Sequence, residues 1–445
     1  MVASGGLYAA TIRYHSGTFY IVCTNVSTTE ESGTANFLIS TKDIWADEWT
    51  NPIYFPFSGI DPSVFFDSDG KVYVQGSWQI DRLKQPSCTL KQFEIDIQTG
   101  KALSEIREIW PGYARYDTEG PHIYKRDGYY YLLAAEGGTF EHHLLSIARS
   151  RSIWGPYESY GGNPIMTADG KPEESVQNVG HGDLFQDQSG LWWALVLGVR
   201  NDDGRFPLGR ETFLTPVDWP EGGWLKIEQP RMQFSHSSIH SAQNDGSDLL
   251  KAHKTNVDDV YIRDPNLSCY RSCTIDKKRD IYLRSSAVDL SALSASPSFI
   301  GKRQRSLESV ATVTVENIKI SSDESLRAGI ALYLDNVRHA VLLLDFASSS
   351  IEFKLTNSAT GLNRTVEREL APEAASAVEL KITASRNSYM FEYRSVITTD
   401  DPWQTVAEVD VMELFARDFT GPILGVYANG TADSEVHFKG FSVVG

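Results

Sequence analysis

The sequence predicts an all-β protein in which a β-propeller is followed by a separate second β domain. The first observation is a repeated template, because four stretches run from a short apolar strand through a polar turn into a strand rich in aromatic and β-branched residues. The turns contain Gly17, Gly70, Gly128 and Gly190. The four stretches are YAATIRYHSGTFYIV, DPSVFFDSDGKVYVQ, EGPHIYKRDGYYYLL and HGDLFQDQSGLWWALV.

The spacing of the template is the second observation. The four glycines are 53, 58 and 62 residues apart, slightly more than the ~40–50 residues of common propeller repeats. Each interval holds several strand-like runs separated by Gly, Pro, Asn and Asp, and no long apolar stripe with helical period competes with them. Four such strands make one propeller blade. An ordinary β-sandwich with accidental internal similarity is the alternative.

The second half of the chain changes character. Residues 1–230 form the predicted propeller, and 231–258 read as a polar linker. Residues 259–445 contain short strands at close intervals with polar turns, which is typical of a β-sandwich. The glycine template does not recur there, so we expect a separate domain. From its pattern alone this domain could bind carbohydrate or brace the propeller.

Composition excludes two classes of partner. The net charge of −17 argues against nucleic acid, which is bound through clustered Lys and Arg. No run of 18 apolar residues is present, so we expect no membrane-spanning helix. The first residues, MVASGGLYAA, lack the charged and apolar segments of a secretion signal, which leaves a cytoplasmic location open.

The template also aligns polar side chains. Counting nine residues back from each glycine gives Tyr8, Asp61, Glu119 and His181. Equivalent positions in a closed ring of repeats face a common axis. The pattern therefore predicts an active site around the propeller channel.

Asp61 and Glu119 carry the chemistry of this prediction. Two carboxyl groups held close together raise the pKa of at least one of them, which then stays protonated near neutral pH. A protonated carboxylic acid facing a pocket is the general acid that cleavage of a glycosidic bond needs. The alternative is that both residues only cap turns.

Other candidate residues are less specific. His181 lies between two glycines and could tune the acid, hold a water, or ligate a metal such as Ca²⁺ directly or through water. Arg210 could donate to sugar hydroxyls, or form a surface ion pair. Tyr8, Trp78 and Phe140 are candidate aromatic platforms for a sugar, although each also suits the core.

These motifs together resemble glycoside hydrolase family 43, and most closely its fungal β-xylosidase/α-L-arabinofuranosidase-like members. The resemblance rests on GGLYAATIRYHSGTFY, GIDPSVFFDSDGKVYV, TEGPHIYKRDGYYYLLAAEGGT, IARSRSIWGPYE, VGHGDLFQDQSGLWWALVLG and PLGRET. The later segment SPSFIGKRQRSLESVATVTVE resembles the concanavalin-like sandwich of the same family.

The resemblance implies a five-bladed propeller, an inverting mechanism and xylo- or arabino-oligosaccharide substrates, with no cofactor required. By motif, Glu119 matches the general acid, and Asp61 the aspartate that orients it and tunes its pKa. His181 matches an axial histidine and Arg210 a pocket arginine. Tyr8 stands where many relatives have the tryptophan of a Trp-Ala-Pro motif. Full-length relatives are expected to be secreted.

The chain also departs from the family pattern. Relatives begin with a further blade whose Asp-Pro-Ser motif supplies the general base, whereas the single Asp-Pro-Ser here contains Asp61 and belongs to a later blade. The sequence thus predicts a propeller whose N-terminal blade is missing and whose hydrolysis is impaired. Three explanations stay open: a truncated fragment of an ordinary family 43 hydrolase, a repurposed, non-hydrolytic catalyst of a biosynthetic pathway, such as a cyclase, or a sugar-binding module.

Overall fold

The computed structural model describes residues 5–27, 33–46, 48–81, 83–201, 204–235, 258–275, 278–316, 325–371, 376–396, 401–431 and 434–445. The chain divides into two compact units. One comprises residues 2–201 and 211–248, and the other residues 202–210 and 249–445 together with residue 1. Residues 236–257 of the predicted linker, 231–258, lie outside the described residues.

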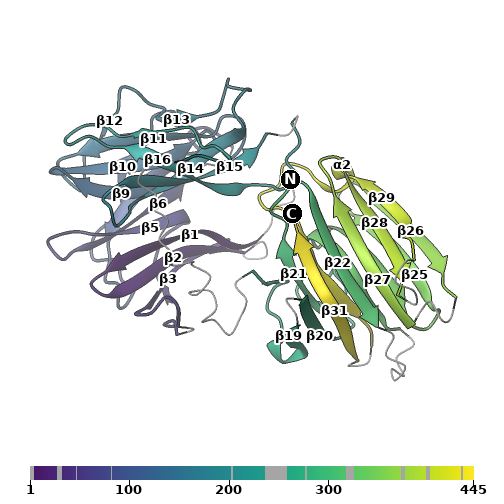
Figure 1. The fold of residues 1–445 in the computed structure, drawn as a ribbon. Helices are drawn as coiled ribbons and strands as arrows, with labels where there is room; N and C mark the ends of the chain where they lie inside the picture. The colour runs from purple at the N-terminus through teal and green to yellow at the C-terminus, as the bar shows by residue number, and fades with distance from the viewer. Residues whose placement is uncertain are drawn as a thin grey trace. The chain divides into compact units, whose positions relative to one another are not determined.

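Four antiparallel sheets of the first unit are the blades of a β-propeller, as the repeat predicts (Figure 1). The innermost strand of each blade carries a template stretch. The first blade contains β1 (Gly6–His15), β2 (Thr18–Val26), β3 (Thr34–Thr41) and β4 (Ile53–Tyr54), and the second β5 (Gly59–Phe66), β6 (Val72–Gln79), β7 (Cys88–Glu94) and β8 (Arg107–Trp110). The third contains β9 (Glu119–Arg126), β10 (Tyr129–Glu136), β11 (Leu144–Ser150), β12 (Glu158–Ser159) and β13 (Met166–Thr167), and the fourth β14 (Val176–Gln186), β15 (Trp192–Arg200), β16 (Glu211–Asp218) and β17 (Lys226–Ile227).

Neighbouring blades pack face to face through apolar side chains. Val22 and Leu38 of the first blade share a core with Val64 and Val74 of the second. Two further clusters join the second blade to the third and the third to the fourth. Propeller packing therefore runs from β1–β4 to β14–β17 among the described residues.

The second unit contains a β-sandwich of two seven-stranded sheets, which confirms the predicted sandwich. One sheet has the order β18 (Val260–Tyr261), β21 (Phe299–Arg303), β30 (Ile423–Asn429), β23 (Arg327–Asp335), β24 (Arg338–Asp345), β25 (Ser350–Asn357) and β26 (Leu362–Glu369). The other has the order β19 (Tyr270–Ile275), β20 (Lys278–Arg284), β31 (Glu435–Val444), β22 (Ser309–Glu316), β27 (Ala377–Ala384), β28 (Ser388–Ser395) and β29 (Gln404–Asp410). A 3₁₀ turn at Leu267–Cys269 and the short helix α2 (Val411–Leu414) complete the unit.

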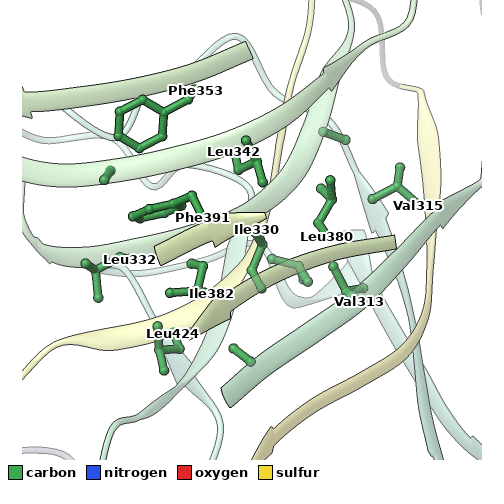
Figure 2. Packing of buried hydrophobic residues seen from close by; sticks show 14 of the residues in the cluster. Val313, Val315, Ile330, Leu332, Leu342, Phe353, Leu380, Ile382, Phe391 and Leu424 are labelled. Atoms are coloured by element: carbon green, nitrogen blue, oxygen red, sulfur yellow. The ribbon is translucent and has the colours of Figure 1, made fainter. Parts of the chain in front are cut away.

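Alternating apolar residues fill the space between the two sheets, as the period of two along each strand requires (Figure 2). The ring of Phe353 on β25 meets that of Phe391 on β28, with centroids 4.9 Å apart. Leu342 on β24 is fully buried in the same cluster. No helix among the described residues is long and apolar enough to cross a membrane.

Leu342→Ala should lower the free energy of unfolding of the sandwich by about 2–5 kcal/mol, because it removes buried methyl groups and leaves a cavity. Urea denaturation measures the change. Leu293→Ala, at a side chain that is 86% exposed, is the matched control and should stay within about 0.5 kcal/mol. Equal effects of the two substitutions would contradict the core assignment.

Candidate active site

A β-bulge interrupts the innermost strand of every blade at the same height. The strand pairing skips one register step between Tyr8 and Thr11, and equivalent steps occur in β5, β9 and β14. The first residue of each bulge has a left-handed backbone: φ is 42° at Ala9, 55° at Asp61, 56° at Gly120 and 45° at His181. Left-handed conformations of residues other than glycine are uncommon, and they concentrate at functional sites.

The pairing corrects the predicted equivalence of the four template residues. Asp61 and His181 are first bulge residues, whereas Tyr8 and Glu119 lie one position earlier in their strands. The reason is that the hairpins differ in length. In the hairpin of β9 and β10, two residues separate the last paired residues, Arg126 and Tyr129. In the hairpin of β5 and β6, five residues separate the last paired residues, Phe66 and Val72. Counting back from the turn glycine therefore does not give the same register in all blades.

The bulges nevertheless bring three predicted residues together. Single ligand atoms of Asp61, Glu119 and His181 all lie within 4.8 Å of one another. His181 Nδ1 is 3.9 Å from Asp61 Oδ2 and 4.0 Å from Glu119 Oε1. The side chain of Asp61 is only 5% exposed, whereas those of Glu119 and His181 keep 19% and 16% of their surface. Glu119 and His181 are thus accessible to a ligand, and Asp61 lies behind them.

Asp61 is placed to orient Glu119. Its Oδ2 accepts a hydrogen bond of 3.2 Å from the backbone N–H of Gly120, the residue that follows Glu119. Gly120 also lies against the His181 ring, since a Cβ atom there would come within 3.1 Å of Nε2. A larger residue at position 120 would therefore displace the imidazole.

Two polar residues that the sequence analysis missed hold the backbone beside Glu119 and His181. The carboxylate of Glu136, fully buried at the end of β10, accepts hydrogen bonds from the backbone N–H groups of Tyr113 and Arg115 in the loop before Glu119. The ring of His143 packs against Gly180, next to His181, and its Nδ1 lies 3.0 Å from Asn178 O. Neither residue has a sequence signal that distinguishes it from an ordinary core residue.

A second polar cluster lies beneath the bulges. Asp183 on β14 is held by both Arg13 Nη atoms, at 2.6 and 2.9 Å, and by the Tyr124 hydroxyl at 2.5 Å. Arg13 also donates to His122 Nδ1 at 3.0 Å. Burial alone would raise the pKa of Asp183, but His122 once it is protonated at low pH, Arg13 and the hydrogen bonds hold it well below its usual range. Arg13 thereby connects the first blade to the third and the fourth.

His122 in this cluster is neutral near pH 7. Its pKa is lowered to about 4, chiefly by burial; Asp183 opposes this shift, whereas the nearby Arg13 and His181 add to it. Because Nδ1 accepts from Arg13, the ring proton is on Nε2. Asp183 and His122 occupy the same register position in their strands, directly after the bulge.

The other predicted residues come from several elements. Trp78 on β6 packs edge-on against Phe57, with ring centroids 5.3 Å apart. Arg210 belongs to the unit that contains the sandwich, where its guanidinium lies 4.5 Å from the centroid of the Phe419 ring. Tyr8 is half-buried on β1, and Phe140 is half-buried after β10. Their roles in sugar binding stay predictions.

The fit of a calcium ion depends on the donor set. Ca²⁺ takes six to eight oxygen ligands. Asp61, Glu119 and His181 offer two carboxylates and a ring nitrogen. Water would have to supply most of the remaining ligands, and a calcium ion bound through water beside His181 stays a prediction.

Comparison with known proteins agrees with this geometry. The sequence profile of glycosyl hydrolases family 43 matches residues 1–225. The chain belongs to this family. The profile of the β-xylosidase C-terminal concanavalin A-like domain matches residues 261–444. The family 43 resemblance is therefore confirmed, whereas the fungal subgroup and the missing blade stay predictions.

Relatives and a solved structure align with most of the chain. A non-reducing end α-L-arabinofuranosidase of Bacteroides ovatus is 32% identical over 449 residues, covering 98% of this chain and 80% of the relative. A xylosidase/arabinosidase of Butyrivibrio fibrisolvens is 33% identical over 386 residues, 79% of this chain and 69% of the relative. The crystal structure of a xylan β-1,4-xylosidase from Bacillus halodurans aligns with a TM-score of 0.83 at 28% identity, covering 99% of this chain and 87% of that one.

The buried His122 should make stability depend on pH. The unfolded state takes up a proton below the ordinary pKa of 6.5, and the folded state only below about 4, so the free energy of unfolding should fall as pH drops between these values. The full contribution is on the order of 3 kcal/mol, and it is present above pH 6.5. Urea denaturation of the wild type and of His122→Gln from pH 7 to pH 4.5 measures it. Parallel pH profiles of the two proteins would contradict the assignment.

Proposed function

We propose that the chain is an inverting glycosidase of the β-xylosidase/α-L-arabinofuranosidase type, with Glu119 as its general acid. The observation that carries the proposal is the Asp61–Glu119–His181 cluster, in which an accessible carboxyl group is oriented by a buried one through Gly120. The relatives named above support the substrate class, because their names describe xylosidases and arabinofuranosidases.

In the proposed reaction Glu119 gives its proton to the glycosidic oxygen as the bond from that oxygen to the anomeric carbon breaks. Water attacks the anomeric carbon from the opposite face and loses a proton to a carboxylate base. Asp61 keeps Glu119 in position through the Gly120 N–H, and His181 closes the other side of that backbone segment.

Asp61 does not suit the role of the base. One of its oxygens lies within 4.8 Å of an oxygen of Glu119, whereas the carboxyl groups of an inverting pair stand ~6.5–9.5 Å apart to leave room for the water. The base must therefore come from another part of the protein. By the family resemblance it belongs to a further propeller blade.

Two apolar faces support the proposal of a further blade. Phe185, Leu195 and Leu214 lie on the face of β14–β16 that turns away from the third blade, and they are 41%, 40% and 36% exposed. On the first blade, Ile12 and Tyr14 lie on the face that turns away from the second blade, at 42% and 64% exposure. Apolar sheet faces of this kind are covered where blades pack on each other. We propose that one more four-stranded sheet covers both faces in the hydrolytic protein.

Glu119→Gln should lower the hydrolysis of xylobiose by about 10²–10⁴-fold, because the amide cannot protonate the leaving sugar. The loss should be smaller for 4-nitrophenyl β-xyloside and α-arabinofuranoside, whose leaving group needs less protonation. Initial rates of both substrate types measure the effect, with Glu141→Gln, an exposed acid after the same β-hairpin, as control. Full activity of Glu119→Gln would refute its role, and a folded 445-residue chain without any activity would favour a hydrolase that needs the further sheet, the repurposed catalyst or the binding module.

Leu195→Gln tests the open face. In the 445-residue chain the substitution should change the free energy of unfolding by less than about 0.5 kcal/mol, because Leu195 is partly exposed. It should also reduce the fluorescence of the apolar dye ANS on the native protein. Urea denaturation and dye titration check both effects. A loss of several kcal/mol would mean that something already covers the face.

A further inference from the structure

The sandwich carries a polar cavity of about 540 Å³ on the outer face of one sheet, away from its core. This volume lies within the range of ~300–1,000 Å³ that ligand pockets occupy. The lining residues come from β23, β24, β25, β26, β30 and the segment after β20, and they include Leu290, Arg327, Glu352, Lys354 and Asn363. All of them belong to one compact unit.

One wall of the cavity is formed by the segment of residues 286–291, which follows β20 and is fixed onto the sheet. The side chain of Leu290 is buried against Val341 and Leu343. Asn429 Nδ2 donates to Ser286 O at 3.0 Å, which fixes the start of the segment. Leu290 and the strand residues give the cavity an apolar floor, while the neighbours of Leu290 supply polar groups at its rim.

The opposite wall presents charged groups in a fixed arrangement. Arg327 binds Asp345 at 2.8 Å and lies 3.3 Å from Glu352, and Lys354 Nζ lies 3.9 Å from the other oxygen of Glu352. These side chains project from adjacent paired strands, because Leu343 pairs with Glu352 and Val341 with Lys354. Groups mounted on strands hold a binding geometry better than groups on loops.

The charges that line the cavity balance. Arg327 and Lys354 are matched by Asp289 and Glu352, and burial lowers the pKa of His339, which favours its neutral form. A cavity without net charge gives no advantage to phosphates or other ions. Mixed donors and acceptors above an apolar floor instead match a neutral sugar, whose hydroxyls need polar partners and whose C–H groups need apolar ones.

We propose that this cavity is a second, non-catalytic binding site for a neutral pentose oligosaccharide, separate from the propeller site. The choice of a pentose rests on the proposed function. Tethering a sugar chain to the same protein raises its effective concentration at the catalytic unit. Lys354 and Asn363, both exposed at the rim, would donate to ring and hydroxyl oxygens, and Glu352 would accept from hydroxyls.

The test is hydrogen-exchange mass spectrometry of the full chain carrying Glu119→Gln, with xylohexaose or arabinohexaose. We expect at least one of them to protect peptides of residues 338–357 and 287–292. Lys354→Ala with Asn363→Ala should weaken this binding at least tenfold, and Glu352→Gln should also weaken it. Lys439→Ala, an equally exposed lysine on the other sheet, should not.

The outcomes separate this proposal from the hydrolase. With Glu119 intact, the cavity variants should hydrolyse 4-nitrophenyl glycosides within twofold of the parent rate. The sugar concentration is raised in tenfold steps up to the millimolar range. Hydrolysis by the chain, with no protection of these peptides at any of these concentrations, would overturn the second site alone. Protection without hydrolysis would support the second site and would overturn hydrolysis by the 445-residue chain without the further sheet. Protection that survives every cavity variant would overturn the placement of the second site.

Discussion

The β-bulge at the start of each innermost strand is the constraint on which the site depends. An uninterrupted strand would send successive side chains to opposite faces of the blade. The extra residue, left-handed at Asp61, Gly120 and His181, breaks this alternation and redirects the neighbouring side chains. Glu119 and Asp61 meet because one precedes its bulge and the other occupies it. The backbone irregularity, more than the residue types, makes a cluster out of three separate strands.

The layer below the bulges explains how this geometry is held. Thr11 and Ser63 follow their bulges and donate to the carbonyl groups of Pro62 and Pro121 in the next blade. The same register position in the later blades is occupied by His122 and Asp183, which meet Arg13 instead. Hydroxyl–carbonyl bonds thus join adjacent blades, and an ion pair joins the first blade to the fourth. The second connection costs desolvation, which bidentate geometry and the Tyr124 hydroxyl offset.

Sequence reasoning could predict the repeat, the two domains and the three clustered residues, because strand periodicity and turn glycines are local signals. It could not predict the register difference between Asp61 and Glu119, since hairpin length is set by turn conformation rather than by the position of the glycine. Arg13 and Asp183 were missed for another reason. They are 170 residues apart, and each alone resembles an ordinary strand residue with a charge. Contacts of this range have no signature in a single sequence.

The missing general base and the exposed apolar faces of the first and fourth blades point to the same additional sheet. Inverting hydrolysis needs a carboxylate across the sugar from Glu119, and Asp61 is too close to Glu119 to serve. The first and fourth blades each keep one apolar face partly exposed, although their other faces are fully used in blade packing. A single additional sheet with two apolar faces would cover both and could carry the base. One physical element thereby accounts for both requirements, which is why we connect the activity of this chain to the covering of these faces.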